Sequence, residues 1–124
     1  VFKVAEPVFG ATQQTPILYK DHIFGIRPDG QLACLDLTGK LVWASGPKTQ
    51  FGLGPLVVAG GLLYAMNDTG KLCLFEASAA QGTPLAQADV FTEGHESWGP
   101  MALAGGRLIV RDFTRILCLD VEAH

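Results

Sequence analysis

A basic cluster and a long apolar run are both missing from this sequence. Its 124 residues include nine Lys and Arg against twelve Asp and Glu, which gives a formal net charge of −3. The basic residues are scattered, so no nucleic-acid partner is predicted, because such partners require clustered Lys and Arg. No apolar stretch approaches the ~20 residues that cross a bilayer, so no transmembrane segment is predicted either.

Paired cysteines and familiar catalytic motifs are missing as well. The three cysteines, Cys34, Cys73 and Cys118, are odd in number and widely spaced, which fits neither a disulfide framework nor a zinc site built from CxxC pairs. Each lies within an apolar run and is predicted to be a small buried residue of a strand. The sequence has no P-loop, no HExxH and no Ser-His-Asp order. No signal peptide is visible at Val1, and the opening is typical of the interior of a longer chain.

The sequence does contain one strand pattern that is repeated three times. The segment QLACLD at residues 31–36 returns as KLCLFE at 71–76 and as RILCLD at 115–120. Repetition at a nearly fixed period indicates a repeat architecture, in which each repeat is one supersecondary unit.

Each repeat is opened by a proline, at Pro16, Pro55 and Pro100. A short turn with Gly or Asp follows, then an apolar second strand, another turn and the Leu- and Ile-rich third strand. Two units continue into a fourth strand, at 40–44 and 85–91. Asp-Gly and Gly-Gly turns supply the positive φ that tight hairpins need, so successive strands are predicted to pair antiparallel.

The second strand of each repeat decides between β architectures. These strands are nearly all apolar instead of alternating, which indicates that both of their faces are buried. A two-layer sandwich leaves one face of each sheet in water, whereas four-stranded sheets stacked around an axis bury both faces. The sequence therefore predicts an all-β fold of four-stranded antiparallel blades, forming a partial β-propeller of about three blades.

The blades are predicted to form a single domain over residues 1–124. One blade covers 15–45, a second covers 54–91, and a third covers 99–122 without its outer strand. Residues 1–5 are predicted to be the outer strand of a preceding blade or of a closing one.

One tryptophan, Trp43, stands on the predicted outer strand of the first unit, and the second unit has none there. A large indole near the rim of a blade can cover the seam with the next blade, which contributes about a few kcal/mol. The second seam is expected to be packed differently.

Three stretches resemble the repeat of the PQQ-like, or quinoprotein alcohol dehydrogenase-like, β-propellers: GQLACLD at 30–36, TGK at 38–40, and Trp43. The likeness extends over about residues 1–121, and residues 97–100 look like the last blades of non-catalytic bacterial members. This resemblance implies a protein-binding propeller in the periplasm or cell envelope of a bacterium. It specifies a scaffold and not a reaction.

The quinone-using members of that group imply PQQ and a calcium ion, beside a pair of adjacent cysteines. No two cysteines are adjacent here, and the only clustered acids in a plausible loop are Glu93 and Glu96, with Asp89 behind them. Calcium takes six or more oxygen ligands, which this stretch cannot supply alone. No cofactor or metal is therefore predicted, and PQQ with calcium is expected only if the chain is part of a dehydrogenase.

A ligand-binding rim is predicted where the loops that lead into the blades meet the turns between second and third strands. The candidate residues at this rim are His95, Glu96, Trp98, Arg111 and Asp112. Each also has a structural interpretation. His95 and Glu96 are then solvated loop residues, Trp98 packs between blades, and Arg111 and Asp112 satisfy the loops or each other.

Two functions follow from this sequence. The first is a non-catalytic propeller segment that serves as a binding or assembly scaffold for a protein or peptide partner, including capture by strand addition. The alternative is a piece of a PQQ-dependent dehydrogenase whose cofactor site lies mostly outside this segment. A WD40 propeller is disfavoured because no Trp-Asp pair occurs in the sequence. The isolated segment is expected to self-associate, because its end blades would expose apolar faces.

Overall fold

Strands and turns make up the described part of the chain, which has no helix. The computed structural model describes residues 1–5, 8–10, 13–93 and 96–122. The strands are β1 (Ile17–Tyr19), β2 (His22–Ile26), β3 (Leu32–Asp36), β4 (Leu41–Ala44), β5 (Leu56–Ala59), β6 (Leu62–Met66), β7 (Lys71–Glu76), β8 (Ala86–Asp89), β9 (Ala102–Ala104), β10 (Arg107–Arg111) and β11 (Ile116–Asp120). In these residues no helix is long and apolar enough to cross a membrane.

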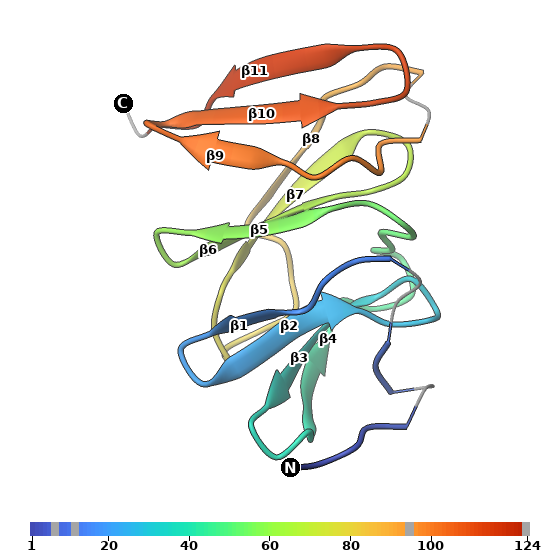
Figure 1. Cartoon of the computed structure of the whole chain (residues 1–124), viewed down its shortest axis with the longest axis vertical. Coiled ribbons are helices and arrows are strands. Elements are labelled where there is room, and N and C mark those ends of the chain that lie inside the picture. The colour runs from blue at the N-terminus through green and yellow to red at the C-terminus, as the bar shows by residue number, and fades with distance from the viewer. Residues whose placement is uncertain (6–7, 11–12, 94–95, 123–124) are drawn as a thin grey trace.

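The strands form three antiparallel sheets, and the order within each sheet follows the chain. The first sheet is β1-β2-β3-β4, the second is β5-β6-β7-β8, and the third has the three strands β9-β10-β11 (Figure 1). The predicted fold class, an all-β partial propeller of about three blades, is confirmed. The outer strands are shorter than predicted, since β4 begins at Leu41 and β8 covers only Ala86–Asp89.

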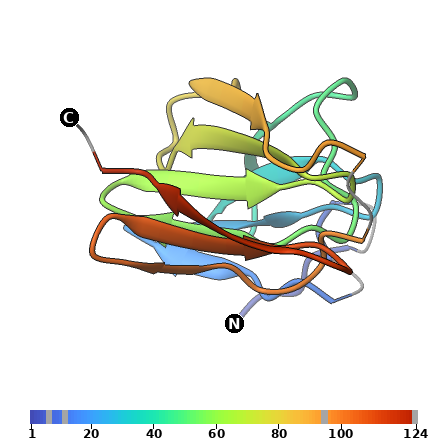
Figure 2. The same ribbon diagram turned by 90° about the horizontal axis from the view of Figure 1, so that it is seen from above.

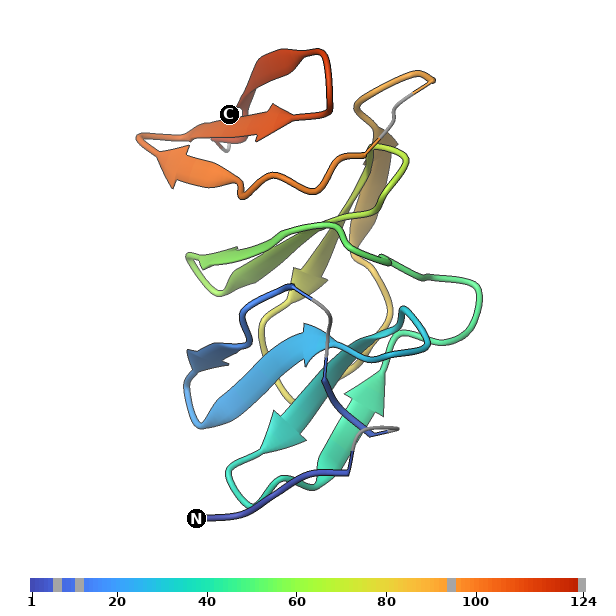
Figure 3. The same cartoon turned by 45° about the vertical axis from the view of Figure 1, so that its right-hand side comes forward.

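The sheets are layered one upon another instead of lying side by side. Figure 1 shows them stacked along the long axis, Figure 2 shows them overlapping when seen from above, and Figure 3 shows the same layering after a turn of 45°. The first strands of the units adjoin, because β5 contacts both β1 and β9. The inner strands therefore lie around a common line, as in a propeller.

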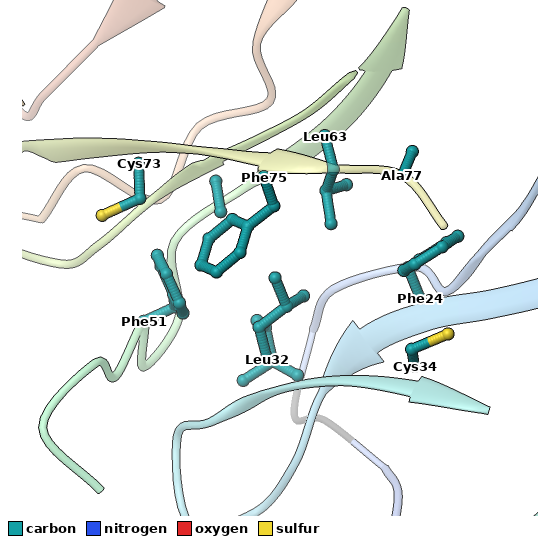
Figure 4. Packing of buried hydrophobic residues seen from close by; sticks show 10 residues of the cluster. Phe24, Leu32, Cys34, Phe51, Leu63, Cys73, Phe75 and Ala77 are labelled. Atoms are coloured by element: carbon teal, nitrogen blue, oxygen red, sulfur yellow. The ribbon is translucent and has the colours of Figure 1, made fainter. Parts of the chain in front are cut away.

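The first seam, between the β1–β4 sheet and the β5–β8 sheet, holds the larger core. Leu63 and Phe75 of the second sheet point towards Leu32 of the first (Figure 4). The buried residues of this seam are Phe24, Ile26, Leu32, Cys34, Phe51, Leu63, Ala65, Cys73, Phe75 and Ala77.

The second seam, between the β5–β8 sheet and the β9–β11 sheet, holds a separate core. Its buried residues are Tyr64, Met66, Phe91, Met101, Leu108 and Val110. Strand β6 contributes to both seams, because Leu63 and Ala65 belong to the first core while Tyr64 and Met66 belong to the second. The near-continuous apolar sequence of this strand is thus explained by burial of both its faces.

Left-handed residues close the hairpin between the first two strands of every sheet. The second hairpin uses Gly60 and Gly61, with φ of 57° and 79°. The first hairpin uses Lys20 and Asp21, with φ of 44° and 63°, where a side chain makes this conformation less favourable. The positive φ that the Gly-Gly turn predicts is confirmed, and Lys20 and Asp21 adopt the same conformation without glycine.

Residues 1–5 form no strand in this structure, although the sequence predicts an outer strand there. The side chains of Phe2 and Val4 lie instead beside Gly39, in the turn between β3 and β4. The N-terminus and the third sheet lie at opposite ends of the molecule (Figure 1), so these residues do not complete the third sheet of their own chain. Pairing with a preceding blade needs a strand edge from such a blade, and that role stays a prediction.

The open face of the first sheet is covered by Phe9. A Cβ built on Gly25 of β2 would collide with the Phe9 ring, so the ring rests directly on this strand. Ala33 and Leu35 of the neighbouring β3 are buried, with exposed fractions of 0% and 1%. The N-terminal segment thereby shields apolar residues that an adjoining blade would cover in a longer propeller.

Candidate functional site

The turns β2–β3, β6–β7 and β10–β11 lie on one side of the stack, with the loops that lead into β1, β5 and β9. We call this side the loop rim; it is the right-hand side of Figure 1. The rim arises because each sheet runs up and down from its inner strand, so equivalent turns of successive sheets point the same way. The predicted convergence of these loops is present.

A pocket of about 350 Å³ opens at the loop rim, where the inner strands begin. Its lining combines the loops before β1, β5 and β9 and consists of Gln13, Gln14, Thr15, Ile17, Leu53, Pro55, Leu56, Trp98 and Pro100. Gln14 fixes two of these loops together, because its Nε2 donates to the carbonyls of Gly52 at 2.5 Å and Gly54 at 3.1 Å. The Oε1 atom of Gln14 is buried and has no hydrogen-bond partner among the described residues.

A second rim pocket, of about 400 Å³, lies between the β2–β3 and β6–β7 turns. Asp29 and Asp68 contribute to its lining together with Asn67 and Gln50. The Asp68 Oδ1 accepts a hydrogen bond of 2.7 Å from the backbone N–H of Leu53, and its main-chain carbonyl accepts one of 3.2 Å from Ser97. Asp68 therefore ties the second sheet's turn to the loops on either side of it.

Asp112 is buried in the β10–β11 turn, with an exposed fraction of 3%. Its Oδ2 accepts hydrogen bonds from Arg115 Nη2 at 2.7 Å and Nε at 3.0 Å, while its Oδ1 accepts from the backbone N–H groups of Thr114 and Arg115. The Arg115 hydrogen bonds, followed by the backbone ones, lower the pKa of Asp112 to about 2. This carboxylate accepts its hydrogen bonds from residues of its own turn.

Arg115 extends that turn towards the second sheet. Its Nη2 donates to the Thr92 carbonyl at 3.1 Å, and its guanidinium lies 5.2 Å from the centre of the Phe91 ring. The Asp112–Arg115 pair thus joins the third sheet to the loop that follows β8. It resembles a structural clamp more than an open ligand site.

The remaining predicted rim residues are dispersed. Trp98 lines the first rim pocket and is 40% exposed. The Arg111 side chain covers Gly99, Glu96 is exposed with a φ of 55°, and His95 lies outside the described residues. A binding role for these residues and for Asp112 stays a prediction.

The acids that the sequence singled out for a cation do not suit calcium as they stand. Asp89 pairs with Lys71 at 3.0 Å, and Glu93 is exposed on a residue with φ of 54°. Within the described ranges, no three His, Cys, Asp or Glu side chains are placed to hold a metal ion. These residues do not fit a calcium ion beneath a quinone, which needs at least six oxygen ligands.

Sequence reasoning missed one repeated aromatic. Phe51 and Phe91 precede β5 and β9, and the backbone N–H of each donates to the carbonyl of a turn glycine, Gly30 at 2.7 Å and Gly70 at 3.2 Å. Both rings are buried, one in each seam. Phe9 covers the first sheet in the corresponding place, and the Phe-Gly pairs at 9–10 and 51–52 are the signal that was available.

The stacked four-stranded sheets, their two apolar seams and the common loop rim define a segment of a β-propeller. A family model described as outer membrane protein assembly factor BamB, built on the PQQ-like repeat, matches residues 28–118. The chain belongs to this family of PQQ-like β-propeller repeats, which confirms the resemblance noted in its sequence.

Solved structures share the fold at low sequence identity. BamB from Moraxella catarrhalis is 16% identical with a TM-score of 0.65, and the match covers 83% of this chain and 29% of that one. Quinohemoprotein alcohol dehydrogenase from Comamonas testosteroni is 18% identical with a TM-score of 0.64, over 85% of this chain and 17% of that one. The computationally designed Ika4 protein is 9% identical with a TM-score of 0.64, over 86% and 64%.

The chain therefore spans less than two thirds of the length of each of these structures. No curated protein sequence matches it. At these identities the structural likeness shows the fold alone.

Proposed function

We propose that this chain is part of a non-catalytic propeller that binds a protein or peptide partner and serves as an assembly scaffold in a bacterial cell envelope. The observation that carries the proposal is the match of the outer membrane protein assembly factor family over residues 28–118. A periplasmic or envelope location is part of the same proposal and rests on this distant resemblance.

The chemistry of the loop rim supports binding over catalysis. Asp68 accepts a hydrogen bond from the Leu53 N–H in the loop before β5, Asp112 accepts from N–H groups of its own turn, and the amide of Gln14 holds the loop before β5. Polar groups used in this way stiffen a surface and are not free to transfer protons. Trp98 is half-exposed beside them, and tryptophan is enriched among the residues that anchor protein interfaces.

A photo-crosslinking experiment tests the partner-binding part of the proposal. We would replace Trp98 by p-benzoylphenylalanine in the full-length parent protein and irradiate living cells. Val42 on β4 offers a matched control, because it is 38% exposed against 40% for Trp98 but lies on the outer strand of the first sheet. The proposal expects a discrete protein adduct from position 98 that is missing from position 42. No adduct, or the same adducts from both positions, would contradict it.

The alternative function is a segment of a PQQ-dependent dehydrogenase. The fold shared with quinohemoprotein alcohol dehydrogenase favours it, at a TM-score of 0.64. Adding PQQ and calcium to the full-length parent protein and measuring dye-linked alcohol oxidation separates the two functions. The scaffold proposal expects no turnover above that of the protein without additions, and robust turnover would replace it by the dehydrogenase.

A further inference from the structure

An apolar pocket of about 300 Å³ lies in the second seam, away from the loop rim. Strands β6, β7 and β8 of the second sheet form most of its wall, and one residue after β11 completes it. The lining residues are Leu62, Tyr64, Leu72, Leu74, Ala86, Gln87, Ala88 and Val121.

Strand register explains why a pocket exists here. In the first sheet Phe24 pairs with Cys34, and Cys34 pairs with Trp43 on the outer strand. In the second sheet the same path leads from Tyr64 to Leu74 and then to Ala86. Ala86 therefore stands where the first sheet has Trp43, and the pocket is the space that an indole would fill.

The first seam shows what an indole does in that position. Trp43 stacks on Phe75 with ring centres 6.2 Å apart and planes inclined by 15°, and it packs against Phe24 at 6.0 Å. Its Nε1 donates a hydrogen bond of 2.8 Å to the carbonyl of Ser78, in the loop after β7. A Cβ built on Gly82 of the same loop would lie 2.6 Å from the indole, so the loop closes over the ring.

The second seam has apolar side chains in the equivalent positions but no indole packed against them. Leu32 and Cys34 in the first sheet are fully buried, whereas their counterparts Leu72 and Leu74 are only half-buried. Apolar side chains left half in water favour any apolar group that can cover them.

The hydrogen-bond acceptor is also repeated. In the first seam the backbone N–H of Ala77, one residue before Ser78, donates to the Gly61 carbonyl at 2.9 Å. In the third sheet the N–H of Val121 donates to the Gly106 carbonyl, also at 2.9 Å. The carbonyl of Glu122 therefore takes the place of the Ser78 carbonyl.

We propose that this pocket is a docking site for the indole side chain of a tryptophan carried by a partner protein. The inference rests on the proposed protein-binding function and adds to it a site and the chemistry of the ligand. The evidence for this choice of ligand comes from the chain itself, because it fills the equivalent space in its first seam with Trp43. A pocket of about 300 Å³ is at the small end of ligand sites, which suits one aromatic side chain.

The test uses the protein's own outer strand as a probe. The peptide GKLVWASG copies residues 39–46, and a second peptide replaces its tryptophan by alanine. Each would be titrated into the ¹³C-methyl-labelled chain while the methyl signals of Leu72, Leu74 and Val121 are followed by NMR. The proposal expects saturable shifts at these methyl groups with the tryptophan peptide and none with the alanine peptide. No shifts, or equal shifts with both peptides, would overturn it.

A substitution in the protein provides the second arm. Ala86→Trp should fill the pocket from within and weaken binding of the tryptophan peptide by at least about tenfold. Ala80→Trp adds the same side chain to the exposed loop between β7 and β8, outside the pocket lining, and should leave binding unchanged. If Ala86→Trp bound the peptide as well as the unmodified chain does, the site would be wrongly placed.

The fluorescence of the introduced indole also tests the site without any peptide. In Ala86→Trp it should show a blue-shifted emission, as a buried ring does, and the variant should resist urea better than the unmodified chain. Failure of this docking site and failure of the scaffold function are separable. Crosslinks at Trp98 without peptide binding would reject the pocket alone, and peptide binding without crosslinks would reject the rim-binding scaffold alone.

Discussion

The two tryptophans of this chain show how position decides the role of a residue. Trp43 lies between two sheets, stacks on Phe75 and donates to the Ser78 carbonyl. Trp98 has 40% of its surface exposed beside the rim pocket. The sequence predicted that Trp43 would cover a seam, because its strand precedes another blade. It placed Trp98 at the rim but could not decide between ligand binding and packing between blades, because loop conformation depends on contacts such as Asp68 with Leu53 that no local pattern encodes.

Trp43→Phe should destabilise the chain by about 1–3 kcal/mol, because it removes part of a packed ring and leaves the Ser78 carbonyl without its donor. Trp98→Phe should change stability by no more than about 0.5 kcal/mol, as is usual for exposed positions. Urea unfolding followed by far-ultraviolet circular dichroism measures both. Equal losses from the two substitutions would contradict the seam role of Trp43.

Asp112 has its counterpart in the second sheet, which shows what its charge adds. Asn67 occupies the β6–β7 turn and accepts backbone hydrogen bonds from Thr69 at 3.0 Å and Lys71 at 2.8 Å without any charge. Asp112 makes the same kind of turn and adds the ion pair with Arg115. Hydrogen bonding to its own loop was one of the roles that the sequence predicted for Asp112. The sequence could not identify Arg115 as the partner.

Asp112→Asn should keep the turn and lose the ion pair, so the variant is less stable than the unmodified chain at pH 7. The pKa of Asp112 is about 2 in the folded chain and about 3.9 when unfolded. Its ionic contribution is therefore complete above about pH 5 and disappears as the pH falls towards 2. Urea midpoints at pH 7, 4 and 2 should converge for the two proteins. A deficit that persists at pH 2 would show that the charge is not its cause.

At the scale of elements, turn residues predicted the hairpins well and packing decided the remainder. Positive φ at Gly60 and Gly61 follows directly from the Gly-Gly pair. Residues 1–5 resemble an outer strand in sequence but form none here, because pairing requires a partner edge, and their role in a preceding or closing blade stays a prediction. The repeated phenylalanine before each inner strand escaped notice because the loops that contain it differ in length.

The Gly-Pro pairs that precede β5 and β9 provide a test of close packing between loop and strand. A Cβ built on Gly54 would fall on the backbone carbonyl of Met66, which cannot move without distorting β6. A Cβ on Gly99 would meet only the flexible Arg111 side chain, at 2.7 Å from its Cδ. We expect Gly54→Ala to cost about 1–3 kcal/mol in urea unfolding and Gly99→Ala clearly less. The reverse order would show that the loop before β5 is not seated as described.

For the whole molecule, the end of the stack differs from its middle. Cys34 and Cys118 occupy equivalent register positions, because Cys34 pairs with Phe24 and Cys118 pairs with Ile109. Cys34 is fully buried in a seam, whereas Cys118 is exposed on the outer face of the third sheet. Phe113 and Ile116 of the third sheet are also about 70% exposed, at 71% and 70%. Such an apolar surface favours association with a further blade or a second copy.

Alkylation by iodoacetamide should separate the three thiols. Burial, and secondarily the charge of Asp36, raises the pKa of Cys34 to about 11, and burial also raises that of Cys73. Both should stay unmodified in the folded chain while Cys118 reacts. If the third sheet mediates self-association, modification of Cys118 should slow as protein concentration rises. A rate that does not depend on concentration, with light scattering of a monomer, would contradict self-association.

The central claim is that the second sheet buries both of its faces, one in each seam. Its most direct test is a methyl NOE experiment on two residues that lie on opposite faces of β6. The structure predicts cross-peaks from Leu63 to Leu32 in the first sheet and from Met66 to Val110 in the third, because each pair belongs to one core. Cross-peaks from only one of these two residues, with the other facing water, would contradict the propeller stack.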